Sequence, residues 1–189
     1  MQNDEWKAQI ERERQDKDAF LAEHDQSPLS PQDRAGFQGL DYFPVDPDYV
    51  FQLEFHEHQQ KRIVTMPSLK GGEQDYLTWG EFRFTVDGRE CTLQAYKSAP
   101  YEAALFVLFR DATCGKETYG AGRYLDLLPQ RDRTDEGKWV LDFNRAYSPT
   151  CAYSEDYACP MVPRENWLDI PVPAGERYPF KQSEEGNRA

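Results

Sequence analysis

The segment 81–96 constrains the fold more than any other part of the sequence. It contains two runs in which apolar and polar residues alternate, FRFTV and RECTLQAY, joined by Asp87-Gly88. An Asp-Gly pair between alternating runs favours the two-residue type I′ turn of a β-hairpin. Counting outward from this turn places Phe84 opposite Cys91, on the same face as the next apolar pair. The sequence therefore predicts antiparallel sheet around this hairpin, with Cys91 in the core.

Alternating or continuous apolar runs recur along the chain, and no helix-length periodic segment separates them. This pattern argues against a βαβ arrangement. It predicts a mainly β fold, an antiparallel barrel or sandwich of about seven strands. In the expected strand 49–58 the aromatic and aliphatic residues share one face. The other expected strands are 62–66, the continuously apolar run 104–111, 119–127 and 138–147.

The two ends of the chain are expected to lie outside this sheet. Residues 4–24 contain no Gly or Pro and predict one long N-terminal helix, and Ser30 is a suitable cap for a second, short helix. From Ser148 onward six prolines predict an extended C-terminal segment that wraps the surface. Within one domain overall, we expect a helical appendage (1–40), a β-rich domain (41–180) and a flexible tail (181–189).

The charge of the chain limits its partners. With 34 acidic and 22 basic residues, the formal net charge is −12. A field of this sign repels nucleic acid and anionic membranes, so neither is an expected partner. Arg outnumbers Lys, and an acidic surface poor in Lys fits either a protein kept soluble at high salt or an ordinary acidic protein.

The chain shows no apolar run of about eighteen residues and no charged, apolar and small-residue leader at its start. We therefore expect a cytoplasmic protein. In that compartment the four cysteines are expected to be thiols or metal ligands, not disulfides.

Two long motifs in the second half of the chain resemble a known family. They are FRDATCGKETYGAGRYLDL and LDFNRAYSPTCAYSEDYACPMVPREN, and SPLSPQDRAGFQGLDYFPVDP lies nearer the N-terminus. Together they are similar to the bacterial and archaeal family called domain of unknown function 1684, over nearly the whole chain. The resemblance implies no established activity or cofactor. The residues that match the family pattern are Arg110, Asp111, Thr118, Tyr119, Gly120, Gly122, Arg123, Tyr124, Asp142, Asn144, Tyr147, Cys151, Cys159, Pro160 and Asn166, whereas Cys114 stands where a small hydroxyl residue is expected.

Arg123 is unusual because it lies among apolar residues on one face of the expected strand 119–127. It is either a buried cation paired with Asp142 or the floor of a ligand pocket. Gly120 and Gly122, on the opposite face, leave room for another backbone or a ligand to come close. The two glycines lack the third glycine and the strand–helix setting of a nucleotide-binding loop.

Asp142 and Asn144 are spaced i, i+2 on the polar face of the expected strand 138–147. Short polar side chains of this kind hold the following loop, a ligand or a metal ion, and loop-holding is the commonest use. A carboxylate near an arginine and two tyrosines also suits acid–base chemistry, although no nucleophile–base spacing supports that role.

Cys151 and Cys159 lie in a loop rich in Tyr and Pro. Their separation is wider than the C-x₂₋₄-C spacing of common zinc sites, so they are only weak metal candidates and no metal is assigned. Two buried thiols, or a pair prone to form a disulfide, is the simpler interpretation.

The leading hypothesis is a pocket that binds a small anionic ligand, because arginines, tyrosine hydroxyls and a carboxamide suit an oxyanion. The alternatives are a structural or interaction module in which the Cys/Pro/Tyr-rich tail acts as a clasp, and a hydrolase or isomerase that uses Asp142 as base and Arg123 as electrostatic stabiliser. Neither a cofactor nor an oligomeric state follows from the sequence. The expected pocket residues are Arg110, Tyr119, Arg123, Tyr124, Asp142, Asn144 and Tyr147.

Overall fold

The computed structural model describes residues 2–68 and 70–179, and the expected flexible tail 181–189 lies outside them. The described chain is mainly β, with a five-stranded antiparallel sheet in the order β2-β3-β4-β5-β6 and a two-stranded sheet formed by β1 and β7. The sheets are not closed into a barrel, so the arrangement is sandwich-like. The strands are β1 Val50–Leu53, β2 His56–Pro67, β3 Glu73–Val86, β4 Arg89–Lys97, β5 Leu105–Phe109, β6 Arg123–Leu127 and β7 Trp139–Asp142.

The hairpin between β3 and β4 confirms the register expected from the sequence. Phe84 pairs with Cys91, and Cys91 is buried. The turn residues Asp87 and Gly88 have φ angles of 50° and 76°. Positive φ at both central positions is what a type I′ turn requires. The Asp-Gly turn therefore predicted the pairing of β3 with β4 in the larger sheet.

Several expected strands have different ends from those predicted, among them 104–111, of which only Leu105–Phe109 forms β5. The expected strand 49–58 is broken after Leu53, so β1 pairs with β7 while β2, which also contains 62–66, pairs with β3. Phe51 and Phe55 still share one face on either side of the break. The distance between ring centroids is 5.0 Å for Phe51 and Phe84, and 5.0 Å for Phe55 and Phe82. The strand expected at 119–127 begins only at Arg123, and that expected at 138–147 ends at Asp142.

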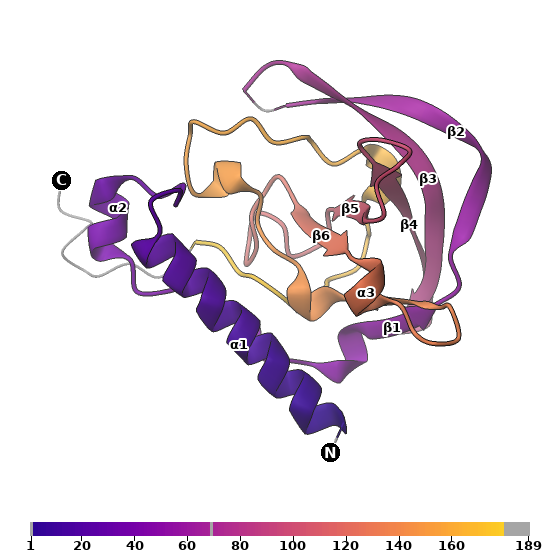
Figure 1. Ribbon diagram of the computed structural model, residues 1–189, viewed down its shortest axis with the longest axis horizontal. Helices are drawn as coiled ribbons and strands as arrows, with labels where there is room; N and C mark the ends of the chain where they lie inside the picture. Colours follow the sequence, from indigo (N-terminus) through magenta and orange to yellow (C-terminus); the bar gives the residue numbers. More distant parts are fainter. Residues whose placement is uncertain (1, 69, 180–189) are drawn as a thin grey trace.

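The long N-terminal helix is present as α1 (Gln2–Glu23), and the short helix α2 (Pro31–Gly36) follows it. Ser30 caps α2 by accepting a hydrogen bond from the backbone N–H of Asp33 at 3.1 Å. α1 lies along one side of the molecule, away from the curved strands β2, β3 and β4 (Figure 1). The remaining helical turns are α3 Pro129–Asp132 and the 3-10 turns η1 Pro47–Tyr49, η2 Phe143–Arg145, η3 Thr150–Ala152 and η4 Arg164–Asn166.

The C-terminal segment (residues 148–179) is extended, as the prolines predict. Its described residues form the turns η3 and η4 but no strand. Its β-type pairing is limited to isolated bridges, such as Tyr42 with Glu176 and Arg110 with Trp167. Apolar residues from this segment, among them Val172 and Ala174, are fully buried in the same cluster as the aromatic side chains of the strands. The segment therefore completes the core.

No helix in the described part of the chain is long and apolar enough to cross a membrane.

Candidate functional site

Helix α1 is held on the body mainly by polar side chains on one face. Trp6 Nε1 donates to Asp142 Oδ2 at 2.9 Å, Glu13 Oε2 accepts from Arg145 Nε at 2.9 Å, and Lys17 Nζ donates to Glu176 Oε2 at 2.7 Å. Steps of three, four or seven residues return to the same side of a helix, which is why these side chains point the same way. Among the α1 side chains described, only the apolar Ile10 and Leu21 are fully buried.

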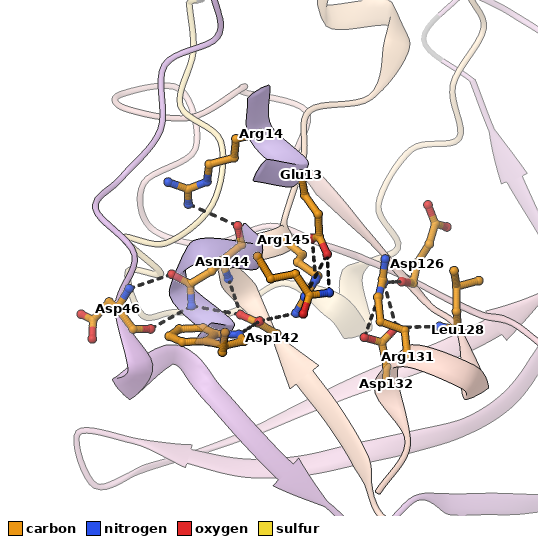
Figure 2. A network of polar contacts seen from close by, with 12 residues as sticks. Glu13, Arg14, Asp46, Asp126, Leu128, Arg131, Asp132, Asp142, Asn144 and Arg145 are labelled. Atoms are coloured by element: carbon orange, nitrogen blue, oxygen red, sulfur yellow. Dashed lines mark hydrogen bonds and ion pairs between the residues drawn. The ribbon is translucent and has the colours of Figure 1, made fainter. Parts of the chain in front are cut away.

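Asp142 is the centre of the polar network beneath α1 (Figure 2). Its Oδ1 accepts from the backbone N–H and the side-chain amide of Asn144, at 2.9 and 3.0 Å. Its Oδ2 accepts from Trp6 and, at 2.6 Å, from Arg145 Nη1. The Asn144 amide in turn bonds the backbone N–H and carbonyl of Asp46, both at 2.8 Å. Asp142 and Asn144 therefore hold loops, the commonest of the uses expected for them.

This geometry argues against Asp142 as a catalytic base. Both oxygens accept two hydrogen bonds each, which uses the four acceptor positions of a carboxylate. The side chain is also only 1% exposed. The carboxylate has no free lone pair with which to accept a proton from a substrate. The arrangement therefore does not support acid–base chemistry at Asp142.

The expected pairing of Arg123 with Asp142 is wrong. Arg123 Nη2 instead bonds Asp111 Oδ2 at 2.6 Å, and both side chains are 0% exposed. The reason is the register of the larger sheet: Arg123 on β6 lies opposite Phe109 at the end of β5, two residues before Asp111. The guanidinium also donates to the carbonyls of the C-terminal segment, namely those of Val172 at 2.8 Å, Ala174, and Glu176 at 3.4 Å.

Of the other four expected site residues, the Tyr147 hydroxyl donates to Asp126 Oδ2 at 2.6 Å, and three contact the C-terminal segment. The Arg110 guanidinium lies 4.2 Å from the ring centroid of Trp167. The Tyr124 hydroxyl donates to the carbonyl of Pro160. The hydroxyl of Tyr119 is 3.9 Å from the sulfur of Cys151, and its ring packs edge-on against Tyr178. These tyrosines and arginines therefore fasten the segment in place, away from the polar network of Asp142.

The thiols of Cys151 and Cys159 lie next to each other. The backbone N–H of Cys151 donates to Cys159 Sγ at 3.3 Å, and neither residue forms a disulfide in the described structure. Among residues 2–68 and 70–179, no group of three or more His, Cys, Asp or Glu side chains is placed to hold a metal ion. Burial, followed by the hydrogen bond with Cys159, raises the pKa of the Cys151 thiol to about 11.

Alkylation of Cys151 by iodoacetamide is therefore expected to be slow at pH 8 and to accelerate about tenfold per pH unit up to pH 10, because the thiolate is the reactive species. In urea-unfolded protein, where a thiol pKa is about 8.5, the same residue should react at least ten times faster at pH 8. Fragment-ion mass spectrometry of timed samples separates Cys151 from Cys159. A rate in the folded protein that levels off near pH 9 would contradict the raised pKa.

A cavity of about 320 Å³ lies between α1 and the body, next to this network. Of the residues expected from the sequence, it is lined only by Asn144 and Tyr147. Four basic and two acidic side chains surround it, in a chain where acidic residues outnumber basic ones 34 to 22. The remaining lining residues are Ile10, Glu13, Arg14, Lys17, Tyr42, Asp126, Arg131, Arg145 and Ala146.

Two donor atoms in the lining of this cavity are buried without a hydrogen-bond partner in the described structure, Arg14 Nε and the Tyr42 hydroxyl. The Arg14 guanidinium lies 4.4 Å from the centroid of the Tyr42 ring. Its Nη atoms donate to the carbonyls of Phe43 at 3.0 Å and Asn144 at 3.3 Å, and it forms no ion pair with any carboxylate of the described residues. Burial, and then the charges of Glu176 and Asp18, raise the pKa of Tyr42, so its hydroxyl remains a donor.

The other cations of the cavity are fixed by carboxylates. Lys17 is paired with Glu176, Arg131 with Asp132 at 2.8 Å, and Arg145 with Glu13 and Asp142. Burial opposes ionisation of Glu13, but the hydrogen bond and charge of Arg145 outweigh it, and the pKa of Glu13 is lowered. The cavity therefore has charged walls joined by ion pairs, and Arg14 is the cation that lacks a carboxylate partner among the described residues.

Sequence reasoning missed the contribution of α1 to this site. The available signal was the spacing of Ile10, Glu13, Arg14, Lys17 and Leu21, which places these residues on one face of a helix. That face mixes charged and apolar residues, whereas a helix that packs through its apolar side alone has a wider apolar stripe. Such a face indicates a polar contact surface.

Comparison with known proteins agrees with the resemblance seen in the sequence motifs. Residues 35–177 match the family described as protein of unknown function (DUF1684). The solution NMR structure of an uncharacterized protein of Haloarcula marismortui is similar to this one, with a TM-score of 0.72 and 40% sequence identity, over 93% of this chain and 96% of that chain. Among curated proteins, none matches the chain. The chain, with its sandwich-like arrangement of two sheets and its N-terminal helix, belongs to the DUF1684 family of proteins of unknown function.

Proposed function

We propose that the protein binds a small anionic molecule in the cavity between α1 and the body. The observation that carries this proposal is the pair of buried donors, Arg14 Nε and the Tyr42 hydroxyl, in the lining of that cavity. An unpaired buried donor costs about 1–3 kcal/mol, and a ligand oxygen that accepts from it recovers this free energy.

The charge of the lining supports an anion over a neutral ligand. Four basic groups face two acidic ones, and the guanidinium of Arg14 offers the planar donors that suit a carboxylate or a phosphate. The ion pairs of Lys17 and Arg145 hold these cations in position before any ligand arrives, so little ordering is required on binding.

This proposal moves the anion site from the seven residues expected from the sequence to a cavity that includes two of them, Asn144 and Tyr147. Arg123, the cation to which the sequence assigned the central role, is committed to Asp111 and to backbone carbonyls. A hydrolase or isomerase that uses Asp142 and Arg123 is not supported, because the two side chains have separate partners and Asp142 has no free acceptor position.

Titration with inorganic phosphate, acetate and citrate, followed by NMR chemical shifts of backbone amides, tests the proposal. Binding is expected to shift amides of residues 10–17 and 144–147. Replacing Arg14 with Gln should weaken the affinity about tenfold or more, since a charge-assisted hydrogen bond contributes about 1.5–3 kcal/mol. Tyr42→Phe should weaken it by a smaller factor.

The matched control is Arg12→Gln, on the exposed side of the same helix. It removes the same charge but leaves the cavity unchanged, so its affinity should stay within about twofold of the wild type at 0.15 M salt. Equal weakening by Arg12→Gln and Arg14→Gln would show a general charge effect, and the absence of any anion binding would refute the proposal directly.

A further inference from the structure

A second cavity of about 300 Å³ lies beside the first along α1. The two share Lys17 and Tyr147 in their linings, so these side chains stand at the junction between them. Lys17 Nζ lies 5.0 Å from the ring centroid of Tyr147 and 5.4 Å from that of Tyr153, and its charge is paired with Glu176. The two cavities therefore adjoin at these side chains, and we call them together the groove beside α1.

The two parts of the groove differ in chemistry. The first is lined by six charged side chains, whereas Lys17 at the junction is the one charged residue that lines the second. The second part is lined mainly by apolar and aromatic side chains, with three uncharged polar ones: Phe20, Leu21, Pro28, Tyr153 and Tyr157, and Gln26, Ser148 and Thr150. Phe20 and Tyr157 are 41% and 42% exposed, which leaves large apolar side chains in contact with water at this end.

We propose that the ligand is an amphiphilic carboxylate, an alkyl or aryl carboxylic acid, with its carboxylate beside Arg14 and Tyr42 and its apolar body in the second cavity. This inference rests on the proposed function and specifies its ligand class. Charge complementarity places the head at the charged end, and the exposed aromatic side chains gain by covering an apolar tail. Together the two cavities have the size typical of sites for small organic ligands.

A series of straight-chain carboxylates from acetate to octanoate, kept below micellar concentrations, tests whether the second cavity binds the apolar part of the ligand. Isothermal titration calorimetry or NMR titration is expected to give an affinity that rises about fourfold per added methylene, the factor for burying one methylene, until the second cavity is full. The alcohols of the same chain length should bind at least tenfold more weakly than the acids. Inorganic phosphate serves as the head-only probe.

Two variants separate the head from the tail. Phe20→Ala should flatten the dependence on chain length while leaving acetate and phosphate affinities unchanged, and Arg14→Gln should weaken every member of the series. Tyr101→Ala is the matched control, because it removes an aromatic side chain that is 90% exposed and lies outside both cavities. Far-ultraviolet circular dichroism spectra of each variant show whether the helix is retained.

The outcomes distinguish the two proposals. If phosphate and acetate bind in an Arg14-dependent way but chain length has no effect, the amphiphilic ligand is refuted and the anion site stands. If the alcohols bind as well as the acids, the carboxylate head is wrong. If nothing binds at 10⁻² M or so, a concentration at which weak carboxylate sites are populated, both proposals fail.

Discussion

Replacing Asp111 with Asn is expected to destabilise the protein by about 3–5 kcal/mol, the cost of leaving one member of a buried ion pair without its counter-charge. Asp111 and Arg123 are both fully buried, with 2.6 Å between Oδ2 and Nη2. The substitution keeps the size of the side chain, so the packing of the neighbouring strands is unchanged. What it removes is the charge opposite a guanidinium whose other partners are backbone carbonyls.

Urea unfolding, followed by circular dichroism, measures this effect as a fall in the midpoint with little change in slope. Glu136→Gln is the control, because Glu136 is 79% exposed and its contact with Lys138 at 3.6 Å is a surface pair. Arg123→Met should be similarly destabilising, and the double variant should lose less than the sum of the two. Additive losses would mean that the pair does not act as a unit.

The second large effect is expected at Gly122. Its φ angle is +108°, and a Cβ atom there would lie 2.6 Å from the carbonyl oxygen of Phe109 and 2.6 Å from Cγ2 of Val162. The carbonyl belongs to β5, inside the larger sheet, and it cannot move away without disturbing the strand. We expect Gly122→Ala to cost about 3 kcal/mol or more, which is roughly 6–12 °C in melting temperature for a chain of this length.

The loss at Gly122 has two causes, the positive φ angle and the steric clash of the added Cβ atom. Gly71→Ala separates them. Gly71 also has a positive φ, +84°, but a Cβ there would meet nothing within 4 Å. It should therefore show only the backbone cost, about 1 kcal/mol. Melting curves for both variants in the same buffer give the comparison. Similar losses at the two positions would contradict a steric role for Gly122.

Features that depend on neighbours in sequence were predictable. The hairpin around Asp87-Gly88 and the capped helix α2 follow from residues a few positions apart. At Gly120 and Gly122 the sequence predicted room for another backbone or a ligand, and the structure places the Phe109 carbonyl against Gly122 but no comparably close atom against Gly120. In each case the backbone itself imposes the requirement, and so the residue type reveals it.

Features that depend on distant residues were not predictable in the same way. The alternation of apolar residues continues through Glu54 and Phe55, so it does not reveal that the chain passes there from one sheet to the other. The partner of Arg123 depends on strand register, which a single sequence does not fix. The wall of the cavity joins Glu13 to Arg145, 132 positions apart, and no local pattern encodes that contact.

The contacts of α1 also set the order in which the molecule can be completed as it is made. α1 precedes the other described elements along the chain, yet Trp6 bonds a residue 136 positions later and Lys17 one 159 positions later. At 5–20 residues per second, translation takes roughly 7–30 s to cover that distance. During this interval the helix lacks the carboxylates of Asp142 and Glu176, although Leu21 can already pack against Leu29 and Leu40. Isolated helices are only marginally stable in water. α1 is thus synthesised before the strands that it packs against, and it completes its contacts only after them.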